Sequence, residues 1–198
     1  MNGPSTPIDL LFVWTPRQLI AETRAPLAAK PEQPARHDYE YARCGVYNVF
    51  MASEPLAGLR VTKVTQHKPK THWALFLRDI ANHYPRADQI TLVMDNLNTH
   101  SPGALYDTFL PKEAKSLWDR FEFIYTPKHG SWRNAAEIEL NVLIRQCLNR
   151  RIGNIEKLSR EVAAWQAHRD QPNATVNWQF KTANARIKLK RLYPTLYV

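Results

Sequence analysis

Cysteine is scarce in this sequence, and its two cysteines, Cys44 and Cys147, stand far apart with no metal-like spacing. Two isolated thiols are typical of a cytosolic protein, and we expect both to be core residues. No apolar run approaches the roughly 20 residues of a membrane span, and no basic region followed by an apolar one marks a secretory signal. These absences favour a cytoplasmic protein without a membrane partner.

Acidic residues are also scarce, with 18 Asp and Glu against 27 Lys and Arg and a net charge of +9. None follows Asp170, whereas the last segment carries Lys181, Arg186, Lys188, Lys190 and Arg191 among aromatic residues. Lys and Arg neutralise phosphates without needing a particular base sequence. The pattern predicts DNA as a partner, and a basic surface that only aids solubility is the alternative.

Hydrophobic residues make up 44% of the 198 residues, enough for one domain with a substantial core. Short apolar runs predict strands at 8–14, 45–52, 59–65, 90–94 and 121–127. Apolar spacing predicts helices at 71–84, 102–121 (two short pieces), 134–151 and 155–170. Residues 15–42, rich in proline and charge, look like an extended excursion. This order of elements predicts an α/β fold with a mixed sheet flanked by helices.

The run 90–94 is nearly continuous in apolar residues, which is typical of a central strand buried on both faces. Asp95 follows it at the edge where open α/β sheets place their chemistry. The next strand leads into a helix that carries Glu137 and Glu139. Converging carboxylates suit a hard ion such as Mg²⁺, and two such ions catalyse phosphodiester cleavage. Asp95 as a turn residue and the glutamates as solvated helix residues are the alternatives.

Three motifs carry a resemblance to a known family: MDNLNTH (94–100), YTPKHGSW (125–132) and NAAEIEL (134–140). In this order and spacing they resemble the mariner-type DDE transposases, in particular the bacterial insertion-sequence branch. The resemblance runs from about Pro16 to the C-terminus. It implies a ribonuclease H-like fold, Mg²⁺ or Mn²⁺, and cutting and joining of DNA at element ends and target. It also implies a homo-oligomer and a nucleoid-associated bacterial protein.

The resemblance assigns roles to individual residues. Asp95 matches the family's second catalytic aspartate, and the pattern Asn134-x-x-Glu137 matches Glu137 to its glutamate, both as metal ligands. Helical periodicity alone does not choose between Glu137 and Glu139, so Glu139 stays in reserve.

Loop residues near the motifs are open to two readings. Lys128 and His129 precede a helix N-terminus, a position that suits phosphate contact. His100 either touches a phosphate or is ordinary surface, and Trp132 is either a core anchor or a base-stacking platform. Asn96 is expected to hold its turn.

The family's first carboxylate is missing from this sequence. An Asp-Glu pair is expected just before a segment like TPRQLIAETR, and here Val13 and Trp14 stand there. Loss of one ligand should weaken metal binding and rate severely, because the members of a metal site act as a unit. Asp9 or Glu22 as a substitute is the open alternative.

These observations divide the chain into an atypical leader with the first strand (1–14), a ribonuclease H-like catalytic domain (15–170) and a basic C-terminal segment (171–198). The resemblance also implies an N-terminal helix-turn-helix region that reads the element ends, and we expect none before the first strand here. A small deletion that fused an unrelated start to the domain would explain the missing Asp-Glu pair and the missing helix-turn-helix region together. The sequence predicts a truncated and impaired transposase catalytic domain. A non-catalytic DNA-binding remnant and a ribonuclease H-like nuclease of another family are the competing hypotheses.

Overall fold

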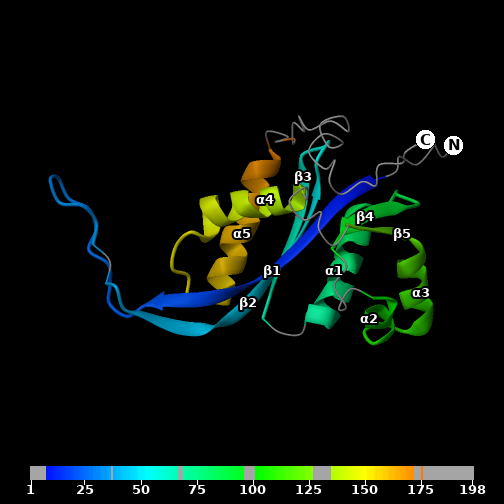
Figure 1. The fold of residues 1–198 in the computed structure, drawn as a ribbon, viewed down its shortest axis with the longest axis horizontal. Coiled ribbons are helices and arrows are strands. Elements are labelled where there is room, and N and C mark those ends of the chain that lie inside the picture. Colours follow the sequence, from blue (N-terminus) through cyan, green and yellow to red (C-terminus); the bar gives the residue numbers. More distant parts are fainter. Residues whose placement is uncertain are drawn as a thin grey trace, which may run out of the picture.

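A computed structural model describes residues 8–36, 38–66, 69–95, 101–126, 135–171 and 175. Within these ranges, five strands form one mixed sheet in the order β3-β2-β1-β4-β5, with helices on both faces (Figure 1). The strands are β1 (Ile8–Glu22), β2 (Tyr41–Glu54), β3 (Leu59–Thr65), β4 (Ile90–Met94) and β5 (Phe121–Tyr125). The helices are α1 (Pro69–His83), α2 (Pro102–Tyr106), α3 (Pro111–Asp119), α4 (Ala135–Leu143), the π-helix η2 (Ile144–Leu148) and α5 (Ile155–Asp170).

The sheet combines two kinds of pairing. Strands β1, β2 and β3 are antiparallel neighbours, whereas β4 pairs in parallel with both β1 and β5. Parallel pairing delivers the carboxyl ends of β4 and β5 to one edge, as the sequence predicted for Asp95. The predicted mixed α/β sheet is confirmed.

Each face of the sheet has its own hydrophobic cluster, because successive side chains of a strand point to opposite faces. Phe50 and Ala52 of β2 pack into the cluster under α1, α2 and α3, and Val49 and Met51 pack into the cluster under α4, η2 and α5. All four side chains are fully buried. Burial of each large apolar side chain stabilises the fold by about 1.5–3 kcal/mol.

Strand β4 is buried mainly on one face, which corrects the expectation of burial on both. Ile90, Leu92 and Met94 are fully buried under α1 and its neighbours, whereas Thr91 and Val93 are half-buried. Among the described helices, α4 lies over β1 and β2, and α5 lies over β3, so these helices cover the second face of β4 less than α1 covers the first. This less covered face leads to Asp95.

Strand β1 is much longer than the 8–14 predicted from the sequence. It pairs with β2 from Leu11 to Glu22, with one irregularity after Gln18. Beyond Leu11 no pairing with β4 occurs, so this part is an edge that tolerates Pro16. The predicted excursion therefore shrinks to residues 23–40, an exposed arm that projects from the body of the molecule (Figure 1).

The helices largely follow their sequence patterns. Helix α1 buries Trp73, Phe76, Leu77 and Ile80, the one-face spacing expected of a surface helix. Arg120 donates to the carbonyl oxygens of three residues at the C-terminal end of α1 and just beyond it, Ala81, Tyr84 and Ala87, at 3.3, 2.8 and 3.0 Å.

The helix predicted over 134–151 differs in one respect. It is α-helical only from Ala135 to Leu143 and continues as the π-turn η2 to Leu148. Both Leu143 and Cys147 are buried against the sheet across this junction.

Candidate functional site

The first residue of the site is Asp95, which directly follows β4 and is exposed. Side chains alternate along the strand, and Ile90, Leu92 and Met94 face α1. Asp95 therefore belongs to the opposite face, with Thr91 and Val93, on the side of α4. The local sequence places a carboxylate at the open edge of the sheet.

The second residue is Glu137 in the first turn of α4, where its side chain is half-buried. Burial raises the pKa of Glu137, and the nearby negative charge of Asp95 raises it further. Asp95, after the end of β4, and Glu137, at the start of α4, thus lie close enough for their negative charges to repel each other. The sequence predicted this convergence, and like-charged carboxylates in one place favour a bound cation.

Glu139, the reserve candidate, has a different environment. Its side chain is 2% exposed and accepts hydrogen bonds from Nε of Arg60 at 2.7 Å and Nε of Arg169 at 2.6 Å. Burial alone would raise its pKa, but the hydrogen bonds and charges of Arg169 and Arg60 lower the pKa overall. Arg60 also contacts Asp170 at 3.0 Å. Glu139 therefore ties α4 to β3 and α5 and is not available to the edge of the sheet.

Arg60 was missed by the sequence analysis. Polar residues alternate with apolar ones in 59–65, a pattern typical of a strand with one exposed face that would put Arg60 in solvent, yet its side chain is 2% exposed. Helix α5 covers that face of β3, and Gln166 of α5 accepts from the backbone of Thr62 at 3.0 Å. The local sequence does not predict that Arg60 is buried, because its burial depends on α5, a helix more than 90 residues further along the chain.

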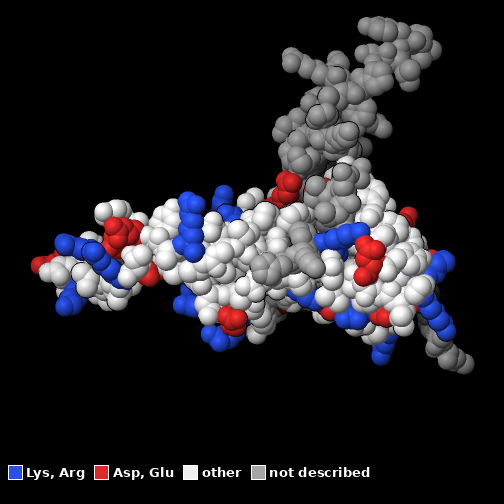
Figure 2. Space-filling view, turned by 90° about the horizontal axis from the view of Figure 1, so that it is seen from below, with Lys and Arg blue, Asp and Glu red and all other residues white. Residues whose placement is uncertain are grey.

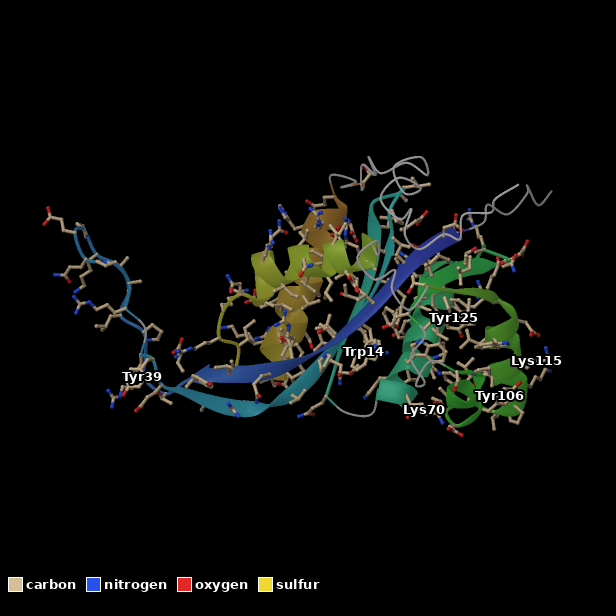
Figure 3. The ribbon with its side chains drawn as sticks, viewed as in Figure 1. Trp14, Tyr39, Lys70, Tyr106, Lys115 and Tyr125 are labelled. Carbon is tan, nitrogen blue, oxygen red and sulfur yellow. The ribbon has the colours of Figure 1, made fainter. Side chains whose placement is uncertain are left out.

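Strand register gives the level in the sheet at which the sequence analysis expected a first carboxylate. Leu11 lies opposite Val93, the last pair of the β1–β4 register, and continuing that register by two residues on each strand puts Val13 level with Asp95. Val13 packs with the cluster under α4, on the same face as Asp95. Trp14 points to the other face, where its ring stacks on Phe50 with centroids 6.2 Å apart (Figure 3).

Neither proposed substitute lies at that level. Asp9 pairs with Thr91, four residues before Val13 and about 13 Å away along the strand at ~3.3 Å per residue. Glu22 lies at the far end of β1 and accepts from Nη1 of Arg151 at 2.6 Å. Among described residues, no group of three or more His, Cys, Asp or Glu side chains gathers as a metal site. Asp95 and Glu137 carry carboxylate oxygens, the type of donor that a hard divalent ion prefers.

Several predicted contact residues lie outside the described ranges. They include Asn96, His100, Trp132 and all the predicted DNA-binding residues: Lys128, His129, Lys181, Arg186, Lys188, Lys190 and Arg191. On the face shown in Figure 2, Lys and Arg side chains alternate with Asp and Glu. No helix in the described part is both long enough and apolar enough to span a bilayer. Cys147 is buried as predicted, whereas Cys44 is exposed, because its half of β2 forms the projecting hairpin.

Comparison with known proteins places this geometry in context. A family profile described as "DDE superfamily endonuclease" matches residues 15–159. No curated protein matches the sequence. Among solved structures, the Mos1 mariner paired end complex with Mn aligns with a TM-score of 0.56 at 13% identity, covering 84% of this chain and 50% of that chain. The Mos1 strand transfer complex aligns with a TM-score of 0.57 at 13% identity, covering 84% and 49%.

These likenesses show the fold, a ribonuclease H-like mixed sheet flanked by helices, as the sequence predicted. The chain spans about half the length of the Mos1 chains that it matches.

Proposed function

The chain belongs to the DDE superfamily endonucleases, and from that membership we propose that it is the catalytic-domain part of an insertion-sequence transposase. Its reaction would be metal-dependent cleavage and transfer of DNA strands, with Mg²⁺ or Mn²⁺ as the metal. The observation that carries this proposal is the convergence of Asp95 and Glu137 at the carboxyl edge of the sheet, where the charge of Asp95 raises the pKa of Glu137.

The two carboxylates would act together. Asp95 is exposed at the end of a strand, and Glu137 is half-buried on the helix that faces it, so both can present oxygens to one ion. A bound divalent ion would activate the attacking oxygen and stabilise the leaving one. The chain's own contribution is to hold the two oxygens in place, with α4 fixed to the sheet by the buried Glu139 and Arg60.

We propose that this chain is impaired because a valine occupies the position of the first carboxylate. The β1–β4 register, continued by two residues, puts Val13 level with Asp95, Val13 packs on the α4 side of the sheet, and an apolar side chain supplies no oxygen to a metal. The proposed partners are DNA element ends and target DNA, bound with the help of the net charge of +9. A homo-oligomer is proposed from the family resemblance.

The second candidate function is a DNA-binding remnant without catalysis. Val13 is the observation that favours it, together with the finding that no three or more His, Cys, Asp or Glu side chains of the described residues gather as a metal site. Salt-sensitive DNA binding without cleavage would support this candidate.

The decisive experiment is a nicking assay on supercoiled plasmid with Mg²⁺ or Mn²⁺, using wild type, Val13→Asp and Val13→Asn. We expect Val13→Asp to nick at least about tenfold faster than wild type, because it restores a charged oxygen ligand. Val13→Asn introduces a side chain of the same shape as aspartate but without its charge, so this variant should nick at the wild-type rate. The double variant Val13→Asp with Asp95→Ala should nick no faster than wild type. This result would exclude a contaminating nuclease as the source of the faster nicking.

The possible results separate the two candidates. A metal-dependent gain that requires Asp95 supports the transposase catalytic domain. DNA binding with no nicking in any variant would sink the catalytic proposal and leave the remnant. A preference for an RNA–DNA hybrid would point instead to a ribonuclease H-like nuclease of another family.

A further inference from the structure

A polar pocket lies away from Asp95 and Glu137. Its volume is about 160 Å³, and it lies between the β1–β2 ribbon and the chain that follows η2. The lining residues are Arg17, Gln18, Ile20, Tyr47, Leu148, Arg150 and Ile152. Arg17 is on the same face of β1 as Val13, four residues and about 13 Å further along. The pocket is therefore a separate place, at the far end of the α4–η2 helix from Glu137.

The inner wall carries one buried donor, on Arg17, that has no acceptor among the described residues. Nε of Arg17 is buried and makes no hydrogen bond within the part of the chain that the structure describes. Tyr47 is the cross-strand partner of Arg17 and is 5% exposed. Burial raises the pKa of Tyr47, while the positive charge of Arg17 lowers it, so the two groups are close neighbours. The net effect is a rise, which keeps the Tyr47 hydroxyl a donor.

The outer wall adds a second guanidinium. Nε of Arg150 donates to the carbonyl of Cys147 at 3.1 Å, and another nitrogen contacts Glu161 at 2.5 Å. Glu161 therefore balances Arg150, whereas no described carboxylate pairs with Arg17. None of the seven lining residues is acidic. A half-buried guanidinium that has no carboxylate partner among the described residues, beside a phenol donor, is the chemistry that binds an oxyanion.

We propose that this pocket is a binding site for a phosphate group, held by Arg17 and Tyr47 with Arg150 at the entrance. A planar guanidinium and a phenol match the oxygens of phosphate, and the volume holds several waters or one such anion at ~30 Å³ per water. The phosphate comes either from a nucleic-acid backbone or from a free phosphate compound. The site does not require the proposed strand cleavage, so the two can be tested separately.

The test measures the melting temperature of the full chain with increasing inorganic phosphate, at constant ionic strength set with chloride. Wild type should be stabilised in a saturable way, because a ligand that binds the folded state raises its stability. Arg17→Met keeps the side-chain length without donors and should weaken the phosphate Kd by about tenfold or more. Arg43→Met, at an exposed arginine of β2, is the matched control and should respond like wild type.

A second measurement identifies the source of the phosphate. The affinity for a short DNA duplex is followed against salt concentration for wild type and Arg17→Met. A salt slope smaller by about one in the variant assigns the site to a DNA phosphate, and an unchanged slope assigns it to a free phosphate compound.

An equal phosphate response in wild type and Arg17→Met overturns the site, as does no response in wild type. If Arg17→Met does not fold, Arg17→Lys decides, since it keeps the charge but lacks the buried Nε donor. A Kd equal to that of wild type in Arg17→Lys then overturns the proposal, and a weaker one supports it.

Discussion

Nε of Arg60 lies 2.7 Å from Oε1 of Glu139 although 79 residues separate them, and each side chain is 2% exposed. This ion pair gives two glutamates of one helix turn different environments. Glu139 is enclosed by Arg60 and Arg169, whereas Glu137 is half-buried beside Asp95. A charged pair in the interior depends on both partners, because a single charge left there is strongly unfavourable.

Glu139→Gln should therefore destabilise the fold far more than Glu137→Gln. We expect Glu139→Gln to lower the free energy of unfolding by about 3–5 kcal/mol, since it removes the buried negative charge that both Arg60 and Arg169 contact and leaves Asp170 as an acidic partner of Arg60. Glu137→Gln should change it by less than about 0.5 kcal/mol, because that side chain has no ion pair among the described residues. Urea unfolding of both variants measures the difference. Similar losses in the two would contradict the assignment of Glu139 to structure.

Acid should weaken the protein through the same glutamate. The pKa of Glu139 is lower in the folded state than its ordinary value, so its contribution to stability is complete above that ordinary value. The contribution is lost as the pH falls through the lowered folded pKa. Urea unfolding at a series of acidic pH values should show a smaller loss in Glu139→Gln than in wild type. Parallel curves for the two proteins would refute this origin of the acid sensitivity.

Asp95→Asn should lower the pKa of Glu137. Burial is the larger cause of the raised pKa and will remain, but the repulsion from Asp95 will be gone. Carboxyl-carbon NMR of the Glu137 side chain, titrated against pH, measures the change. Asp9→Asn is the control, because Asp9 lies about 13 Å back along the sheet and should leave that pKa where it is. An unchanged pKa in Asp95→Asn would mean that the two carboxylates are not neighbours.

Gly153→Ala tests the tight contact between the segment after η2 and β1. A methyl group at Gly153 would meet Cβ of Ala21 at 2.5 Å and its Cα at 3.0 Å. The backbone is held there, since the amide of Ile20 donates to the carbonyl of Ile152 at 3.1 Å. We expect a loss of about 1–3 kcal/mol in unfolding free energy from overpacking.

The double variant Gly153→Ala with Ala21→Gly is the matched rescue. Removing the methyl of Ala21 relieves the clash and should restore part of the lost unfolding free energy. The gain will be reduced by about 0.5–1 kcal/mol, because glycine in a strand is itself destabilising. A double-mutant cycle in urea therefore shows a favourable coupling energy. Additive losses would show that the contact relaxes without strain.

Local pattern was enough to predict much of the fold. The strand 90–94, the strand 59–65 and the helix 155–170 have the predicted bounds, because each is delimited by a clear change of pattern or a capping residue. Asn154, for example, accepts from the backbone of Lys157 at 3.0 Å and starts α5 where the sequence indicated. The convergence of Asp95 with the helix of Glu137 also followed from the sequence, since parallel strands end at a common edge.

The sequence by itself thus determined the alternation of elements, the mixed sheet and the edge at which two carboxylates meet. Only the tertiary structure decided that Glu139 is locked by Arg60, that β1 runs on to Glu22, and that Leu11 pairs with Val93 in the register of β1 against β4. The physical reason is that periodicity specifies which side chains share a face, but not which distant element covers that face. Burial of Arg60, pairing of β1 with β2 and the register of β1 against β4 all depend on contacts between distant parts of the chain.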